Sequence, residues 1–263
     1  MTDTDIRHRG APQGVWLGVL RGLTVGFGIC SITWAVFSAP VDNAEIPFAG
    51  AAAGILKGES FDSAKLRELK RQLDSTPADQ LRPVGLDDVA VIRLKLFETK
   101  LTEGDIRAGS PDFVGLEASF AAALSKNPSN SFLWFADYWL GRVRGDATDR
   151  GIKLLRMSYE TGPNEAWIAQ RRNPAALGSF STLPQDLSER AFSEFVRLVQ
   201  SGLYRDAANI LAGPGWPIHQ QLLSRLAPLD EADRHAMARE LAYKDLDGVS
   251  VPGIPDEPPS RPF

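Results

Sequence analysis

The side chains best suited to contact a ligand are concentrated in one short stretch, residues 162–173. This stretch offers an indole, two guanidinium groups, a carboxylate and an amide, carried by Asn164, Glu165, Trp167, Arg171 and Arg172. An indole stacks against a sugar ring, and amide and guanidinium groups supply directional hydrogen bonds to its hydroxyls. We therefore interpret these residues as a contact site for a protein partner or a glycan. The structural alternative makes Asn164 a helix cap, Trp167 a core residue and both arginines solvated.

Residues with catalytic chemistry lack the spacing of a recognisable active site. Glu194 and Asp206 are one candidate acid and base pair for glycoside hydrolysis, but among 33 acidic residues many such pairs arise by chance. Ser158 and Ser179 lack the glycine-flanked turn of a hydrolase nucleophile, and no glycine run closes as a phosphate loop. The single Cys30 and three scattered histidines match no metal-ligand spacing. We expect a protein that is not an enzyme, without cofactor or metal; an unrecognised glycan-acting enzyme is the alternative.

The elements that must position these residues are predicted to be helices. Apolar residues recur at intervals of three and four, and glycine or proline ends most runs. The predicted helices cover residues 61–73, 86–101, 113–124, 131–141, 152–159, 186–200, 204–211, 218–226 and 231–241, with another after Asn164. The helix over 131–141 is apolar on most faces, so we predict that it is central and that its aromatic residues pack in the core. No alternating run of β-branched residues predicts a strand, and the expected fold class is all-α.

An uncharged apolar segment near the N-terminus predicts a membrane anchor. Residues 22–39 carry no charge, and a helix of that length covers about 27 Å, close to the ~30 Å hydrocarbon core of a bilayer. Arg21 can extend to the headgroups, so the predicted transmembrane helix covers residues 15–39. Basic residues precede this segment and acidic residues follow it, which predicts a single-pass bacterial inner-membrane protein with a cytoplasmic N-terminus and a periplasmic C-terminal domain. The alternatives are a cleaved secretory signal, which Pro40 disfavours, and a buried core helix.

The rest of the chain is predicted to form one helical domain. The expected organisation is a cytoplasmic tail at 1–14, the anchor at 15–39, the helical domain at 45–245 and a proline-rich tail at 246–263. The formal charge of −4 and the pI of about 5.5 provide no broad basic surface, so we expect no nucleic-acid partner.

Several turns resemble those of tetratricopeptide repeats. Residues 58–64 read Gly-Glu-Ser-Phe-Asp-Ser-Ala and residues 202–207 read Gly-Leu-Tyr-Arg-Asp-Ala, which is similar to the glycine, aromatic and alanine spacing between the two helices of such a repeat. Pro128 and Pro163 are 35 residues apart, close to the repeat length of about 34. One helical hairpin cannot bury its apolar face alone, so neighbouring hairpins stack.

The spacing of the motifs is nevertheless uneven. Trp134 and Trp167 lie 33 residues apart, but the turn glycines are separated by 46, 41 and 57 residues and occupy positions 58, 104, 145 and 202. The resemblance therefore implies an irregular tetratricopeptide-like array of α-hairpins following the N-terminal transmembrane helix.

A second resemblance concerns function. Residues 127–130, Asn-Pro-Ser-Asn, and residues 159–165, Tyr-Glu-Thr-Gly-Pro-Asn-Glu, followed by Trp167, resemble membrane-anchored helical proteins of bacterial exopolysaccharide biosynthesis, the VpsP-like group. The resemblance covers residues 45–215, implies an accessory role in assembling or exporting a surface polysaccharide, and carries over no catalytic residue. We expect a non-enzymatic scaffold attached to the membrane, with a cell-envelope protein as partner and polysaccharide as a further candidate. A generic periplasmic protein-binding module is the alternative.

Overall fold

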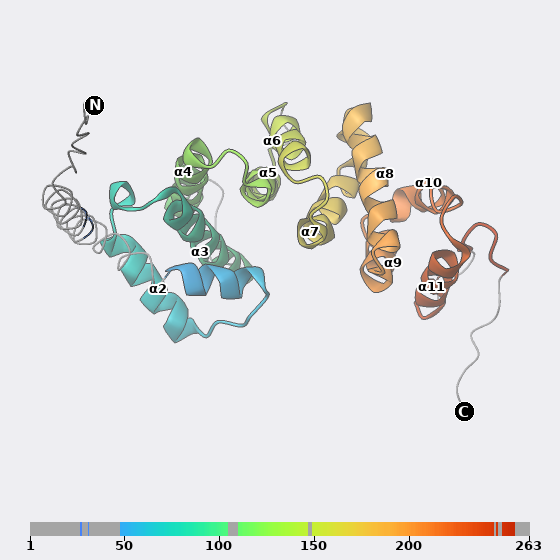
Figure 1. Ribbon diagram of the computed structural model, residues 1–263, viewed down its shortest axis with the longest axis horizontal. Coiled ribbons are helices and arrows are strands. Elements are labelled where there is room, and N and C mark those ends of the chain that lie inside the picture. The colour runs from blue at the N-terminus through green and yellow to red at the C-terminus, as the bar shows by residue number, and fades with distance from the viewer. Residues whose placement is uncertain are drawn as a thin grey trace, which may run out of the picture. The chain divides into compact units, whose positions relative to one another are not determined.

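A computed structural model describes residues 27, 31, 48–104, 110–146, 149–244, 246 and 249–255. Every regular element within these residues is helical, which confirms the all-α prediction (Figure 1). The α-helices are α2 (Ser63–Ser75), α3 (Pro83–Thr102), α4 (Pro111–Lys126), α5 (Ser131–Arg144), α6 (Asp149–Thr161), α7 (Ala166–Leu177), α8 (Gln185–Gln200), α9 (Tyr204–Ala212), α10 (His219–Ser224) and α11 (Glu231–Ala242). Three short 3₁₀ helices are η1 (Ala78–Gln80), η2 (Phe180–Thr182) and η3 (Trp216–Ile218).

The predicted anchor, residues 15–39, lies outside the described residues except for positions 27 and 31. None of the helices in the described part of the chain is long and apolar enough to cross a bilayer. The tail at 1–14 and residues 256–263 of the proline-rich tail also lie outside the description.

The chain divides into two compact units after Asp88. The first unit contains helical residues 48–56, helix α2, helix η1 and the beginning of α3. In α2 the side chains of Leu66, Leu69 and Leu73 are buried, and the side chain of Asp62 accepts a hydrogen bond from the Lys65 backbone N–H at 2.7 Å. This capping interaction satisfies one of the free N–H groups at the helix start.

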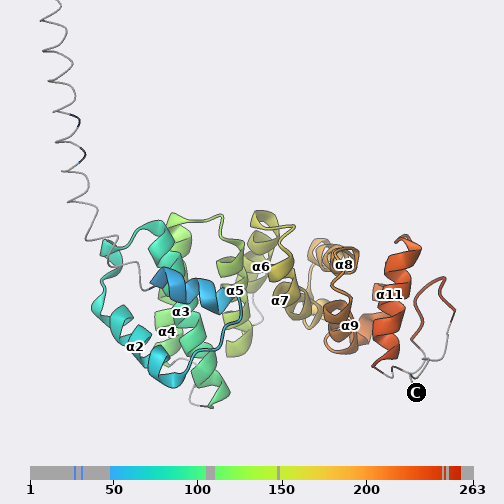
Figure 2. The same cartoon turned by 60° about the horizontal axis from the view of Figure 1, so that its bottom comes forward.

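In the second unit, helices that are consecutive or nearly consecutive in the chain pack in pairs, and each pair packs against the next. Helix α3 meets α4 through the rings of Phe97 and Phe113, whose centroids are 4.7 Å apart in an edge-to-face arrangement. Helix α5 packs against α6, α7 against α8, and α9 against α11, while contacts of α4 with α5, α5 with α7 and α8 with α9 join the pairs. Figures 1 and 2 show this succession from α4 to α11.

Helix α5 is the apolar centre that the sequence predicted. Its buried apolar side chains come from both sides of the helix and are Phe132, Leu133, Phe135, Ala136, Tyr138 and Leu140. Asn130 caps its first turn by accepting from the Leu133 N–H at 3.1 Å. The helix ends at Gly145, whose φ of 87° lies in the left-handed region that other L-residues rarely adopt. The other three turn glycines predicted from the sequence also have positive φ and are Gly58, Gly104 and Gly202.

Candidate functional site

The predicted contact stretch contains a buried ion pair at its centre. Arg172, on α7, is 0% exposed, and Glu194, on α8, is 1% exposed. The Arg172 Nε and Nη2 groups both donate to Glu194 Oε1, at 3.0 and 2.7 Å. The remaining donors of the guanidinium reach the backbone carbonyls of Ser158 at 2.5 Å and Gly162 at 2.9 Å. Because its donors are all directed inward, Arg172 joins α7 to α6 and α8.

The same network satisfies the second oxygen of the carboxylate. The Tyr159 hydroxyl donates to Glu194 Oε2 at 3.0 Å, and the Arg172 guanidinium carbon lies 4.2 Å from the centre of the Tyr159 ring. Burial raises the pKa of Glu194, whereas the neighbouring Arg172 opposes that rise, and burial also raises the pKa of the Tyr159 hydroxyl. Ser158 extends the network to α5 by donating to the Ser131 carbonyl at 2.9 Å.

This arrangement corrects three expectations from the sequence. Arg172 was expected to face a partner, or else solvent, but it lies in the core with Glu194. Arg171 and Arg172 are consecutive residues of α7, so their side chains point about 100° apart around the helix axis and face different surroundings. Asn164 is exposed and does not cap α7, because Glu165 occupies the cap position and no side chain there bonds to the first turn. Glu194, considered as one of a catalytic pair, is paired with Arg172 instead.

The surface part of the stretch is a small patch formed by Glu165, Trp167 and Arg171. Glu165 Oε1 accepts from the Ser131 hydroxyl at 3.0 Å, and its Oε2 accepts from the Trp167 indole N–H at 3.1 Å. The Trp167 ring lies against Phe132, with 5.2 Å between the ring centroids, and remains 37% exposed. The Arg171 guanidinium carbon lies 5.9 Å from the indole centroid. We call these three residues the Trp167 patch.

A hollow of about 450 Å³ lies along α3 and α5, and we call it the α3–α5 groove. It combines one indole with hydroxyl, carboxylate and ammonium groups, and its lining residues are Lys95, Glu98, Thr99, Leu101, Thr102, Glu103 and Trp139. Trp139 is half-buried and meets Phe97 edge to face at 6.3 Å. The sequence assigned Trp139 to the core along with the rest of α5, but this indole contributes to a surface hollow.

The charge of Arg171, in the Trp167 patch, acts on one carboxyl group of the α3–α5 groove, Glu98. Burial raises the pKa of Glu98, and the positive charges of Lys95 and Arg171 oppose this rise. Arg171 therefore lies close enough to Glu98 for its charge to act there. The structure thus connects one predicted contact residue with a groove that the sequence did not predict.

Replacing Arg171 by glutamine is expected to raise the pKa of Glu98 further, because a positive charge that favours the carboxylate is removed. Carbon-13 NMR titration of the glutamate carboxyl groups measures this change. The matched control is Arg142→Gln at an exposed position on α5, which should leave the titration of Glu98 unchanged. An unchanged pKa in Arg171→Gln would mean that the patch and the groove are electrically independent.

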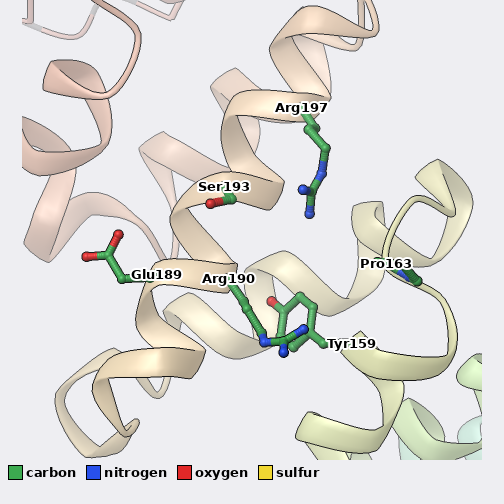
Figure 3. A pocket seen from close by; sticks show the side chains of 6 residues that line it. All are labelled: Tyr159, Pro163, Glu189, Arg190, Ser193 and Arg197. Atoms are coloured by element: carbon green, nitrogen blue, oxygen red, sulfur yellow. The ribbon is translucent and has the colours of Figure 1, made fainter.

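Two further hollows lie along α8, one of the helices that pack against α7. Their volumes are about 210 and 170 Å³. Both include Pro163 and Arg197, so we treat them as one feature, the arginine groove. The first hollow also contains Tyr159, Glu189, Arg190 and Ser193 (Figure 3). The second also contains Asn164, Ala166, Ala169, Glu194, Leu198, Gln200 and Ser201. Asn164 is therefore the only one of the predicted contact residues that lines this groove.

Among the described residues, no cluster of three histidine, cysteine, aspartate or glutamate side chains is arranged to hold a metal ion. Comparison of the chain with protein-family models, with curated proteins and with solved structures finds no match.

Proposed function

We propose that this chain is a non-enzymatic scaffold that contributes to the assembly or export of a bacterial surface polysaccharide. In this proposal residues 15–39 anchor it in the inner membrane and the helical part lies in the periplasm. The helices form an irregular tetratricopeptide-like array, and the α3–α5 groove together with the Trp167 patch contacts the glycan. The composition of that groove is the observation that carries the proposal.

The repeat-like architecture is supported by the way the helices pair. Helix α5 packs against α6 and α7 packs against α8, and the two pairs pack against each other through α5 and α7. This is expected where a single hairpin has too little core to be stable. Glycines with positive φ follow the ends of two helices, Gly145 after α5 and Gly202 after α8. They allow the chain to turn sharply into the next helix. Stacked hairpins leave extended grooves along their surfaces, and such grooves are used for binding.

The α3–α5 groove has the chemistry that a sugar requires. Trp139 offers a partly exposed indole, Thr99 and Thr102 offer hydroxyls, and the two carboxylates and Lys95 offer acceptors and a donor. A volume of about 450 Å³ falls within the range of about 300 to 1,000 Å³ typical of small-molecule sites. A mixture of one aromatic surface with several hydrogen-bonding groups favours a polyhydroxylated ligand over an apolar one.

Substitution of Trp139 by leucine is expected to weaken binding of oligosaccharides prepared from the surface polysaccharide of the source cell by about 30-fold, since truncating a central aromatic contact typically costs about 2 kcal/mol. Isothermal titration calorimetry on the full chain measures the loss. The matched control is Trp134→Leu, which changes another half-buried α5 indole that lies outside the groove and donates to the Pro128 carbonyl. Equal affinities for the two variants, with unchanged melting temperatures, would remove the groove from the proposal.

The membrane part of the proposal has a separate test. Alkaline phosphatase fused to the C-terminus is active only outside the cytoplasm, so activity is expected in the membrane fraction of cells expressing the fusion. Activity confined to the soluble periplasmic fraction would identify residues 15–39 as a cleaved signal, and an inactive fusion would place the C-terminus in the cytoplasm. Western blotting of the fusion serves as the expression control.

A further inference from the structure

We propose that the arginine groove binds an acidic segment of a protein partner, with Arg190 and Arg197 each taking one carboxylate. This site lies outside the α3–α5 groove, so it adds a second binding surface to the proposed scaffold and does not depend on glycan binding.

The two arginines share one face of α8. They are seven residues apart, which corresponds to two helical turns and about 10.5 Å along the axis. Figure 3 shows both side chains extending from α8 toward the side of Tyr159 and Pro163, whereas Glu189 extends the other way. Both arginines are half-buried, which holds their guanidinium groups near the groove.

Neither arginine has an acidic partner within the part of the chain that the structure describes. The two carboxylates that line the groove are already engaged, since Glu189 accepts from Arg225 at 2.8 Å and Glu194 accepts from Arg172 at 2.7 Å. Arg190 and Arg197 therefore leave the groove with uncompensated positive charge, although the whole chain carries a formal charge of −4. A half-buried guanidinium without a counter-charge favours an anionic ligand.

The shape and lining of the groove favour a peptide among anionic ligands. Beyond Arg197 its wall combines the apolar side chains of Ala166, Ala169 and Leu198 with the polar side chains of Asn164, Gln200 and Ser201, which suits the mixed apolar and polar groups of a peptide. Tyr159 is 1% exposed and its ring faces the Arg172 guanidinium, so it offers no open surface on which a sugar could stack. A polyproline II peptide has three residues per turn and rises about 3.1 Å per residue, so two acidic residues three positions apart lie on one face, about 9 Å apart, which is close to the spacing of the two arginines.

The test uses the full chain in a neutral detergent and a fluorescein-labelled deca-glutamate peptide, with fluorescence anisotropy as the readout. The double substitution Arg190→Gln with Arg197→Gln is expected to weaken binding by at least about tenfold, because each charged hydrogen-bonding site is lost. The control, Arg142→Gln with Arg205→Gln, removes the same charge from two exposed positions and should change affinity less than about twofold. Deca-glutamine should not bind.

Other ligand chemistries produce different outcomes. If an oligogalacturonate binds more tightly than deca-glutamate and this binding is lost in the Arg190 and Arg197 variant, the ligand is an acidic glycan and not a peptide. If sulfate competes fully with deca-glutamate, the groove is an anion site without preference for a peptide. Equal losses in the two double variants, or no binding of deca-glutamate, would overturn the proposal. If the glutamine variant has a lowered melting temperature, Arg190→Lys with Arg197→Lys keeps both charges, and it should bind more weakly than the wild type because the bidentate geometry is lost. The Trp139→Leu variant should bind deca-glutamate normally, which separates this inference from the proposed glycan site.

Discussion

Replacing Arg172 by alanine lowers the free energy of unfolding by about 3–5 kcal/mol, whereas replacing its neighbour Arg171 by alanine leaves it unchanged within error. The difference is expected because Arg172 is fully buried and its removal leaves the Glu194 carboxylate in the core without a counter-charge. Arg171 is exposed, and its guanidinium donates a hydrogen bond to the Trp167 carbonyl at 3.2 Å. Urea denaturation followed by circular dichroism measures both values.

The pH dependence of the Arg172→Ala variant provides a further check. Burial already raises the pKa of Glu194, and loss of Arg172 removes the main charge that opposes this rise. When the pKa of a carboxyl group is higher in the folded than in the unfolded state, ionisation of that group lowers the free energy of unfolding. This loss disappears as the pH falls and the carboxyl group becomes protonated. The destabilisation should therefore be smaller in mildly acidic than in mildly alkaline buffer. Equal destabilisation by the two alanine substitutions would contradict the buried ion pair.

Removing the charges of Arg172 and Glu194 together is expected to lower the free energy of unfolding by less than the sum of the losses in the two single variants. In Arg172→Met with Glu194→Leu no buried charge lacks a partner, so the double variant should be more stable than Arg172→Met alone, with a coupling energy of about 2–3 kcal/mol. It should remain below the wild type in stability, since the Gly162 carbonyl and the Tyr159 hydroxyl lose their partners and the Ser158 carbonyl loses one of its two donors.

A double-mutant cycle measured by urea denaturation supplies the coupling energy. The control cycle combines Arg225→Met with Glu189→Leu, an ion pair at 2.8 Å whose side chains are both nearly half exposed. Exposed pairs couple weakly, by less than about 1 kcal/mol. Coupling energies of similar size in the two cycles would mean that burial does not strengthen the interaction between Arg172 and Glu194.

The positions of the helices could be predicted closely because they depend on local signals. The interval 186–200 predicted α8, which spans Gln185–Gln200, because most of its apolar residues recur at helical spacing and are buried. The interval 131–141 predicted α5, which continues to Arg144 because the turn begins only at Gly145. Capping and left-handed glycine positions are also local, which explains why the four turn glycines could be identified from the sequence around the helix ends.

The candidate site was predicted only in part because the function of a side chain depends on which face of its helix is covered. Arg172 shares a face with Ile168 and Ala176, both 0% exposed, and this four-residue spacing was a signal that the arginine points inward. Its counter-charge, Glu194, lies 22 residues away on another helix, and no sequence pattern identifies such a partner. Only the packing of α7 on α8 decides that these two charges meet.

The sequence by itself determined the all-helical class, the approximate bounds of the helices and the location of the most polar stretch, since these follow from periodicity, capping and composition. The tertiary structure decided which members of that stretch are accessible, turned Arg172 into a core residue and kept Trp167 at the surface. It also placed Trp139 in the α3–α5 groove and left Arg190 and Arg197 beside a second groove. The physical reason is that grooves and buried ion pairs arise between helices, so their residues are close in space without being regularly spaced in the chain.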